Sequence, residues 1–206
     1  MISLESIQSY AKEDLPVIAE KLEAADIEQL VAWLNEKNDT IRYPSFLLLE
    51  DRSANHNDVY PYWHTFTAKF ASPNSFQRSL GLMMVAANVK WDRENKFETI
   101  LERYLSFFDD EKPVTVRQCI QSLAKIVPYK PALLNRISDK LMAIDIAARK
   151  ESQRKILLMD ILTILILINR QTPREEINRY IHQAMTGGLL DKKGKSTIEN
   201  LIQNTV

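Results

Sequence analysis

The sequence predicts an all-α protein, a right-handed α-solenoid of about five helical hairpins with short capping helices at both ends. Four arginines recur at spacings of 36, 39 and 37 residues, each just inside an apolar helical run: Arg42, Arg78, Arg117 and Arg154. A unit of this length cannot bury its own apolar face, so it has to stack on its neighbours. The β-branched residues fall inside helical patterns, and the chain has only four glycines and eight prolines, which argues against a sheet.

Composition places the chain among ordinary globular proteins. Its 206 residues are 45% hydrophobic and 26% charged, so we expect one folded domain over residues 1–206 without long disorder. The segment before Asp26 is expected to form two short helices, separated near Pro16, that cap the N-terminal end. Asp26 is expected to cap the first long helix, and Asp39 the helix that completes the first hairpin.

The later hairpins follow from apolar periodicity and from the prolines. The second pairs residues 59–70 with 75–89, because Pro73 stops one helix and Asn74 or Ser75 starts the next. The third pairs 97–108 with 116–126 across an acidic turn. The remaining predicted helices are one that starts at Pro131, a long apolar one over 152–169, one from Thr172-Pro173 to Met185, and a last short one over 196–203 that caps the C-terminal end.

One run resembles a known family. Val116-Arg117, followed by Ile120, Leu123 and Ile126, resembles the second helix of a HEAT repeat. The resemblance covers about residues 26–186 and is to HEAT-like (armadillo-type) α-helical repeat proteins, most closely to bacterial members with no assigned function that share runs like Ser75-Phe-Gln-Arg78-Ser-Leu-Gly and Val116-Arg117-Gln-Cys-Ile-Gln-Ser-Leu. It implies an inter-repeat ladder built from the four arginines, and it implies no chemistry.

The resemblance implies a scaffold that binds a protein or peptide through its concave face. We expect the binding side chains at polar positions of the second helices and at the basic residues near the long apolar helix. These candidates are Asn88, Gln118, Gln121, Lys125, Arg149, Lys150 and Lys155. The four repeat arginines are expected to be structural.

Candidate chemistry is sparse. The three histidines show no ligand spacing with Cys119, so we predict no metal, cofactor or catalytic residue, and Cys119 is expected in the core. Gly194-Lys195-Ser196 lacks the spacing and the preceding strand of a phosphate-binding loop, and Lys192 to Lys195 is expected to be a solvated turn. Asp160 lies inside an apolar helix and needs a partner; an arginine from the next unit is favoured over exposure in the groove.

The alternative function is nucleic-acid binding, by analogy with HEAT-like DNA glycosylases that excise alkylated bases. The residues that suggest it are Trp63, Trp91 and Asp92. However, Trp91 and Asp92 are adjacent, and on a helix the side chains of adjacent residues diverge by about 100°. The N-terminal half is also acidic, whereas a groove that binds the phosphate backbone of DNA should be positively charged. In the aromatic cluster over residues 60–70, Trp63, Phe66 and Phe70 are expected in the core, and Tyr60, Tyr62 or His64 remain possible surface residues.

Charge divides the chain. Residues 1–112 hold 12 Lys+Arg against 19 Asp+Glu, whereas residues 113–206 hold 15 against 8. This asymmetry predicts an anionic partner for the second half or weak head-to-tail self-association of a monomer, with surface drift as the alternative. A single cysteine and an N-terminus without a signal-peptide pattern favour the cytoplasm, and the stretch 156–168 is too short to span a membrane.

Overall fold

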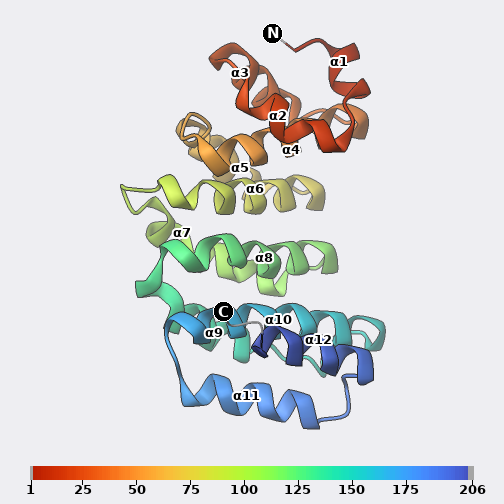
Figure 1. Cartoon of the computed structure of the whole chain (residues 1–206), viewed down its shortest axis with the longest axis vertical. Coiled ribbons are helices and arrows are strands. Elements are labelled where there is room, and N and C mark those ends of the chain that lie inside the picture. The colour runs from red at the N-terminus through yellow and green to blue at the C-terminus, as the bar shows by residue number, and fades with distance from the viewer. Residues whose placement is uncertain (1, 204–206) are drawn as a thin grey trace. The chain divides into compact units, whose positions relative to one another are not determined.

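The computed structural model describes residues 2–203, and within that range it contains α-helices and short 3₁₀ turns but no strand (Figure 1). The all-α prediction is therefore confirmed. The chain divides into two compact units, residues 1–99 and 100–206, which are described separately below.

Unit 1 is built from six α-helices and the start of a seventh. Their bounds are α1 (Leu4–Ser9), α2 (Leu15–Glu20), α3 (Ala24–Trp33), α4 (Asp39–Asn55), α5 (Trp63–Ala68), α6 (Ser75–Asn88) and α7 (Lys96–Leu105), with 3₁₀ turns at Lys12–Asp14, Tyr60–Tyr62, Lys69–Ala71 and Val89–Trp91. Helix α4 is central, because α1, α2, α3 and α6 all pack against it, and α5 packs on α6. The core includes Leu49, Trp63, Phe66 and Leu82, each at most 1% exposed, and Phe70 is also buried, so the three predicted core aromatics are confirmed.

The N-caps of α3 and α4 lie three residues and one residue, respectively, before the predicted ones. Helix α3 begins at Ala24 with Glu23 as its N-cap, so Asp26 is not the cap. Instead, Asp26 accepts hydrogen bonds from the backbone N–H groups of Glu23 (3.0 Å) and Ile2 (2.8 Å), which completes a capping box. Asn38, the neighbour of Asp39, caps α4. In both helices, a polar residue that precedes the predicted cap occupies the N-cap position beside the free N–H groups.

Unit 2 is organised around one long helix. Its helices are α8 (Pro113–Ile126), α9 (Leu134–Met142), α10 (Glu151–Gln171), α11 (Glu175–Thr186) and α12 (Lys192–Gln203), with 3₁₀ turns at Ser106–Asp109, Val127–Tyr129 and Pro131–Leu133. Helices α8, α9, α11 and α12 all pack against α10, and Figure 1 shows the blue α11 and α12 beside it. Leu123, Ile161 and Leu165 are fully buried at its centre. Apolar residues at helical spacing on α10 therefore serve several neighbours at once.

Two predictions in unit 2 are wrong in detail. Helix α12 begins at Lys192, so the predicted solvated turn is its first turn; the Asp191 carboxylate accepts the Gly194 N–H at 2.8 Å, as an N-cap does. Thr172 does not cap α11, which begins at Glu175, and Asn169 instead accepts the Arg174 N–H at 2.8 Å. Within residues 2–203, no helix combines the length and the apolarity that crossing a bilayer requires.

Candidate functional site

Three of the four repeat arginines bind the loop that precedes their own helix. Nη1 of Arg42 donates to the Glu36 carbonyl at 3.0 Å, and Arg42 also pairs with Asp39. Nη1 of Arg78 donates to the carbonyls of residues 72 and 73, both at 3.0 Å, and Nε of Arg154 donates to the carbonyl of residue 149 at 2.8 Å. These bonds hold each loop against the helix that follows it. They do not form the predicted ladder between repeats.

Arg117 is the exception, and its position explains why. Arg42, Arg78 and Arg154 are the fourth residues of their helices, whereas Arg117 is the fifth residue of α8. One residue turns a side chain by about 100° around a helix. Val116, which takes the fourth position in α8, is buried, and Arg117 points instead to α10.

Asp160 of α10 joins the two helices. Arg117 donates from Nε to Oδ2 at 2.6 Å and from Nη2 to Oδ1 at 3.2 Å, and Nε2 of Gln121 donates to Oδ1 at 2.9 Å. The predicted arginine partner of Asp160 is confirmed, although it lies one repeat earlier in the chain rather than one later. The Asp160 side chain is 11% exposed and that of Arg117 is 34% exposed, so the pair lies at the edge of the core.

Exposed and half-buried side chains of α8 and α10 flank this pair. We call this surface the α8–α10 face, and its residues are Arg117, Gln118, Gln121, Lys125, Gln153, Ile156 and Asp160. Arg117, Gln121 and Lys125 follow one another at four-residue spacing, which puts them on one side of α8. Ile156 is 43% exposed, so the face offers an apolar contact as well as hydrogen-bonding groups.

A groove of about 230 Å³ lies at the N-terminal ends of the same two helices. Its lining includes Arg117 and Gln153 of the α8–α10 face, together with Arg149, Lys150 and the acidic pair Asp110 and Glu111. Of the predicted binding residues, Arg149 and Lys150 line this groove. Gln118, Gln121 and Lys125 follow along α8 outside its lining. Charges of both signs line the groove.

Two of the basic residues predicted to bind a partner, Arg149 and Lys155, already bond other residues of unit 2. Nη2 of Arg149 donates to the Phe108 carbonyl and to Asp109, both at 2.9 Å, and Lys155 pairs with Asp191 at 2.5 Å. The hydrogen bond from Lys155 and that from the Gly194 N–H hold the pKa of Asp191 below its usual range. Lys155 thus lies away from the groove, while Lys150 is exposed at the start of α10.

Asn88 is not a surface residue, contrary to prediction. It is fully buried in α6 of unit 1, where Nδ2 donates to Ser53 Oγ at 3.2 Å and to the Met84 carbonyl at 2.9 Å. Its Oδ1 is buried with no hydrogen-bond partner among the described residues. The apolar residues around it in sequence place it on the packed side of α6, where its polarity is a poor guide to exposure.

The residues behind the glycosylase analogy have structural contacts. Asp92 is 6% exposed and accepts the backbone N–H groups of Lys96 (2.8 Å) and Phe97 (2.9 Å), which open α7, as well as the Tyr60 hydroxyl (2.9 Å). Trp91 Nε1 donates to the Ser53 carbonyl at 2.8 Å. From the loop before α7, this aspartate accepts free N–H groups of the first turn of the helix, and both of its oxygens take part in these bonds.

Cys119 lies in the core, as predicted. It is fully buried, its Sγ is 3.3 Å from the Tyr104 carbonyl, and burial raises the pKa of its thiol. In the described part of the chain, no three His, Cys, Asp or Glu side chains gather closely enough to hold a metal ion. Of the histidines, His56 bonds Glu20 at 2.7 Å, which lowers the pKa of Glu20.

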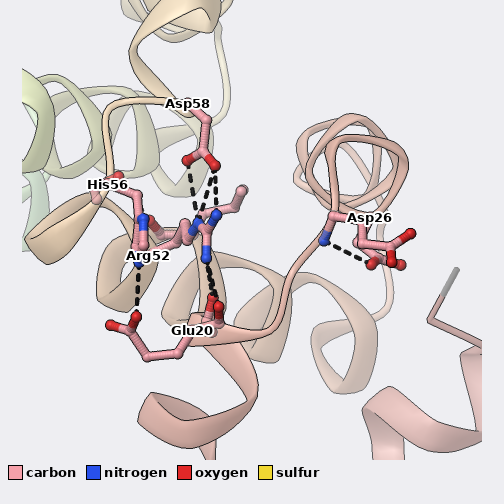
Figure 2. A network of polar contacts seen from close by, with 9 residues as sticks. Glu20, Asp26, Arg52, His56 and Asp58 are labelled. Atoms are coloured by element: carbon pink, nitrogen blue, oxygen red, sulfur yellow. Dashed lines mark hydrogen bonds and ion pairs between the residues drawn. The ribbon is translucent and has the colours of Figure 1, made fainter.

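Sequence reasoning missed Arg52, the centre of a polar network in unit 1 (Figure 2). Its Nη1 donates to the carbonyls of Ala19 (3.1 Å) and Glu20 (2.8 Å) at the end of α2, while its Nη2 pairs with Asp58 at 2.7 Å. Arg52 therefore ties α2 to the loop after α4. Its position three residues after the buried Leu49 would have placed it on the apolar side of the helix.

Comparison with known proteins adds no relative. No protein-family model matches the chain, no curated protein matches it, and no solved structure matches it.

Proposed function

We propose that the chain is a non-catalytic, cytoplasmic HEAT-like scaffold, a right-handed α-solenoid of about five hairpins that binds a protein or peptide through its concave face. The observation that carries the proposal is the α8–α10 face. There, polar side chains of two packed helices remain at the surface beside a groove, and Asp160 holds Arg117 and Gln121 in a fixed arrangement. Side chains fixed before binding lose less conformational entropy when a partner docks.

The chemistry of the face suits binding to a polypeptide. Gln118 and Gln121 offer both donors and acceptors for main-chain groups, and Ile156 offers an apolar contact. The face contains no cysteine or histidine, and its one carboxylate is committed to Arg117 and Gln121. A nucleophile with an adjacent general base, which covalent catalysis needs, is not among its residues.

Nucleic-acid binding is less well supported. Phosphate tracking needs cations along a continuous surface. Arg149 and Arg154 instead donate to carbonyls of unit 2, and Lys155 pairs with Asp191 away from the groove. The acidic residues Asp110 and Glu111 also line the groove beside Arg149.

A peptide-display selection against the purified protein tests the binding proposal. The double variant Gln121→Ala, Lys125→Ala should weaken the selected peptides at least about tenfold, since several hydrogen bonds of about 0.5–1.5 kcal/mol each are lost. The matched control, Lys193→Ala, Asn200→Ala, removes one lysine and one amide from exposed positions of α12 and should bind normally. Equal binding by both variants, or selection of duplex DNA with a steep salt dependence in place of peptides, would overturn the proposal.

The solenoid has a separate test in small-angle X-ray scattering. A compact chain of 206 residues has a radius of gyration of about 17 Å. Stacked hairpins extend in one direction, so the proposed solenoid should give a clearly larger value. A value at the compact limit would contradict the solenoid without bearing on the α8–α10 face.

A further inference from the structure

Unit 1 contains a cavity of about 650 Å³ that the proposed scaffold function does not use. It is bounded by the end of α3, the start of α4, α5 with the 3₁₀ turn that follows it, and the start of α6. Most of the residues that line it have side chains with hydrogen-bonding groups. The lining residues on which the argument depends are Asn35, Lys37, Arg42, Lys69, Asn74 and Gln77.

Lys69 is the buried cation of this cavity. It is only 7% exposed, and its Nζ donates to Oδ1 of Asn35 at 2.6 Å and to Oε1 of Gln77 at 2.5 Å. Gln77 is oriented by a bond from Nε2 to the Leu34 carbonyl at 2.8 Å, so its oxygen faces the lysine. An ammonium has three N–H donors, and both acceptors here are neutral amides. Among the described residues, no carboxylate pairs with Lys69. The cavity wall also includes Glu36, whose side chain is exposed to solvent.

Arg42 adds a second buried cation to the same wall. It is 9% exposed, and its guanidinium lies 5.6 Å from the centre of the Phe76 ring. Its own carboxylate partner, Asp39, has a side chain 76% exposed and is therefore well screened by water. Burial, and then repulsion from Arg42, lower the pKa of Lys69 from 10.5 to about 8. Two cations are therefore buried in this wall, whereas the nearby carboxylates, Glu36 in the lining and Asp39 beside Arg42, are both exposed.

We propose that this cavity binds the phosphate or carboxylate group of a small polar molecule, with Lys69 as its principal cation and Arg42 beside it. The volume is within the range of about 300–1,000 Å³ that is usual for small-molecule sites. The amides of Asn35, Asn74 and Gln77 suit the polar remainder of such a molecule. The cavity also lies at the first turn of α6, where the helix dipole favours negative charge.

Binding and protonation of Lys69 must be linked. A bound anion favours the charged lysine, so it should raise the pKa of Lys69. Conversely, affinity should fall as pH rises through the free-state pKa of about 8, because the lysine loses its charge. A lysine that merely ties α3 to α6 through Asn35 and Gln77 would show neither effect.

Calorimetry with inorganic phosphate and with succinate, at constant ionic strength in chloride, is the direct test. We expect saturable binding of at least one of the two near neutral pH, weakening roughly tenfold by about pH 9.5 as Lys69 deprotonates. Which probe binds distinguishes a phosphate site from a carboxylate site. Failure of both to bind would overturn the proposal.

Two further measurements identify the residue. Lys69→Met should abolish binding. The control Lys12→Met changes an exposed lysine of unit 1 that does not line the cavity, and it should bind within about twofold of the wild type. In the wild-type protein, side-chain NMR of Lys69 should show its pKa rising when the bound probe is added, a result that does not depend on the folding of a variant. Undiminished binding by folded Lys69→Met, or an unchanged pKa of Lys69 at saturation, would contradict the site.

Discussion

Asp160 of α10 accepts both guanidinium bonds of Arg117 from α8, at 2.6 and 3.2 Å, across 43 positions of the sequence. Paired bonds of this kind fix orientation as well as distance. Arg117 thereby forms an ion pair between α8 and α10, which belong to different helical hairpins. It therefore positions α8 against α10 and, with them, the proposed binding face.

Arg117→Ala is expected to lower the free energy of unfolding by about 1–3 kcal/mol, because it leaves a mostly buried carboxylate with Gln121 as its remaining partner. Chemical denaturation measures the loss. As a control, Arg136→Ala removes an exposed pair with Glu102 and should cost about 0–1 kcal/mol. A double-mutant cycle of Arg117 and Asp160 should give a coupling energy above about 0.5 kcal/mol, and a value near zero would refute the role given to the pair.

Tyr60 should make stability sensitive to alkali. Burial and the hydrogen bond to Asp92 raise its pKa well above the ordinary value of 10.0. Because the folded state favours the protonated Tyr60 hydroxyl, this group contributes its full stabilisation below the unfolded-state pKa of about 10. The contribution is lost as the pH rises from there toward the folded-state pKa. The wild type should therefore lose stability between about pH 10 and 12 more steeply than Tyr60→Phe in matched denaturation series. Parallel curves would show that Tyr60 is not the responsible group.

Gly81→Ala should destabilise unit 1. A Cβ at this position would stand 2.7 Å from the Phe66 carbonyl oxygen and 2.9 Å from Cβ of Lys69, where α5 packs on α6. Overpacking costs about 1–3 kcal/mol and the better helix propensity of alanine returns about 1 kcal/mol, so we expect a net loss on the order of 1 kcal/mol. Gly194→Ala, in the first turn of α12, meets only side-chain atoms at 3.2 Å or more and should be near neutral in thermal melts.

Charge should govern any self-association. Unit 1 holds 10 Lys+Arg against 15 Asp+Glu, and unit 2 holds 17 against 12. Attraction between opposite charges of separate molecules fades as the Debye length falls from about 30 Å at 0.01 M salt to about 8 Å at 0.15 M. Sedimentation velocity should thus detect weak association at low salt that disappears at physiological salt. If the protein stays monomeric at every salt concentration, the charge difference between the two halves is neutral variation of the surface and does not drive self-association.

Helix positions were largely predictable because apolar periodicity and proline placement act locally. Asn74 caps α6 as expected, and the predicted long helix over 152–169 corresponds to α10. The helix starts at Ala24 and Lys192 were missed because the caps depend on which neighbouring side chain reaches the free N–H groups. Sequence spacing does not resolve such competition.

The candidate site was predictable only in part. Gln121 and Lys125 are exposed on α8 because their four-residue spacing selects the side opposite the core. Asn88 was misplaced because burial of a polar residue depends on tertiary partners, here Ser53. The regular spacing of the arginines concealed the one-residue offset of Arg117, and Lys69 was missed because its acceptors lie 34 residues before it and 8 after it.

Chemical-shift mapping of a selected peptide on the isotopically labelled protein tests the central claim most directly. If the α8–α10 face is the binding surface, the largest shifts should fall on the amides and side chains of residues 117–125 and 149–160, and they should vanish in Gln121→Ala, Lys125→Ala. Saturating shifts confined to other helices, with the double variant binding as tightly as the wild type, would contradict the account.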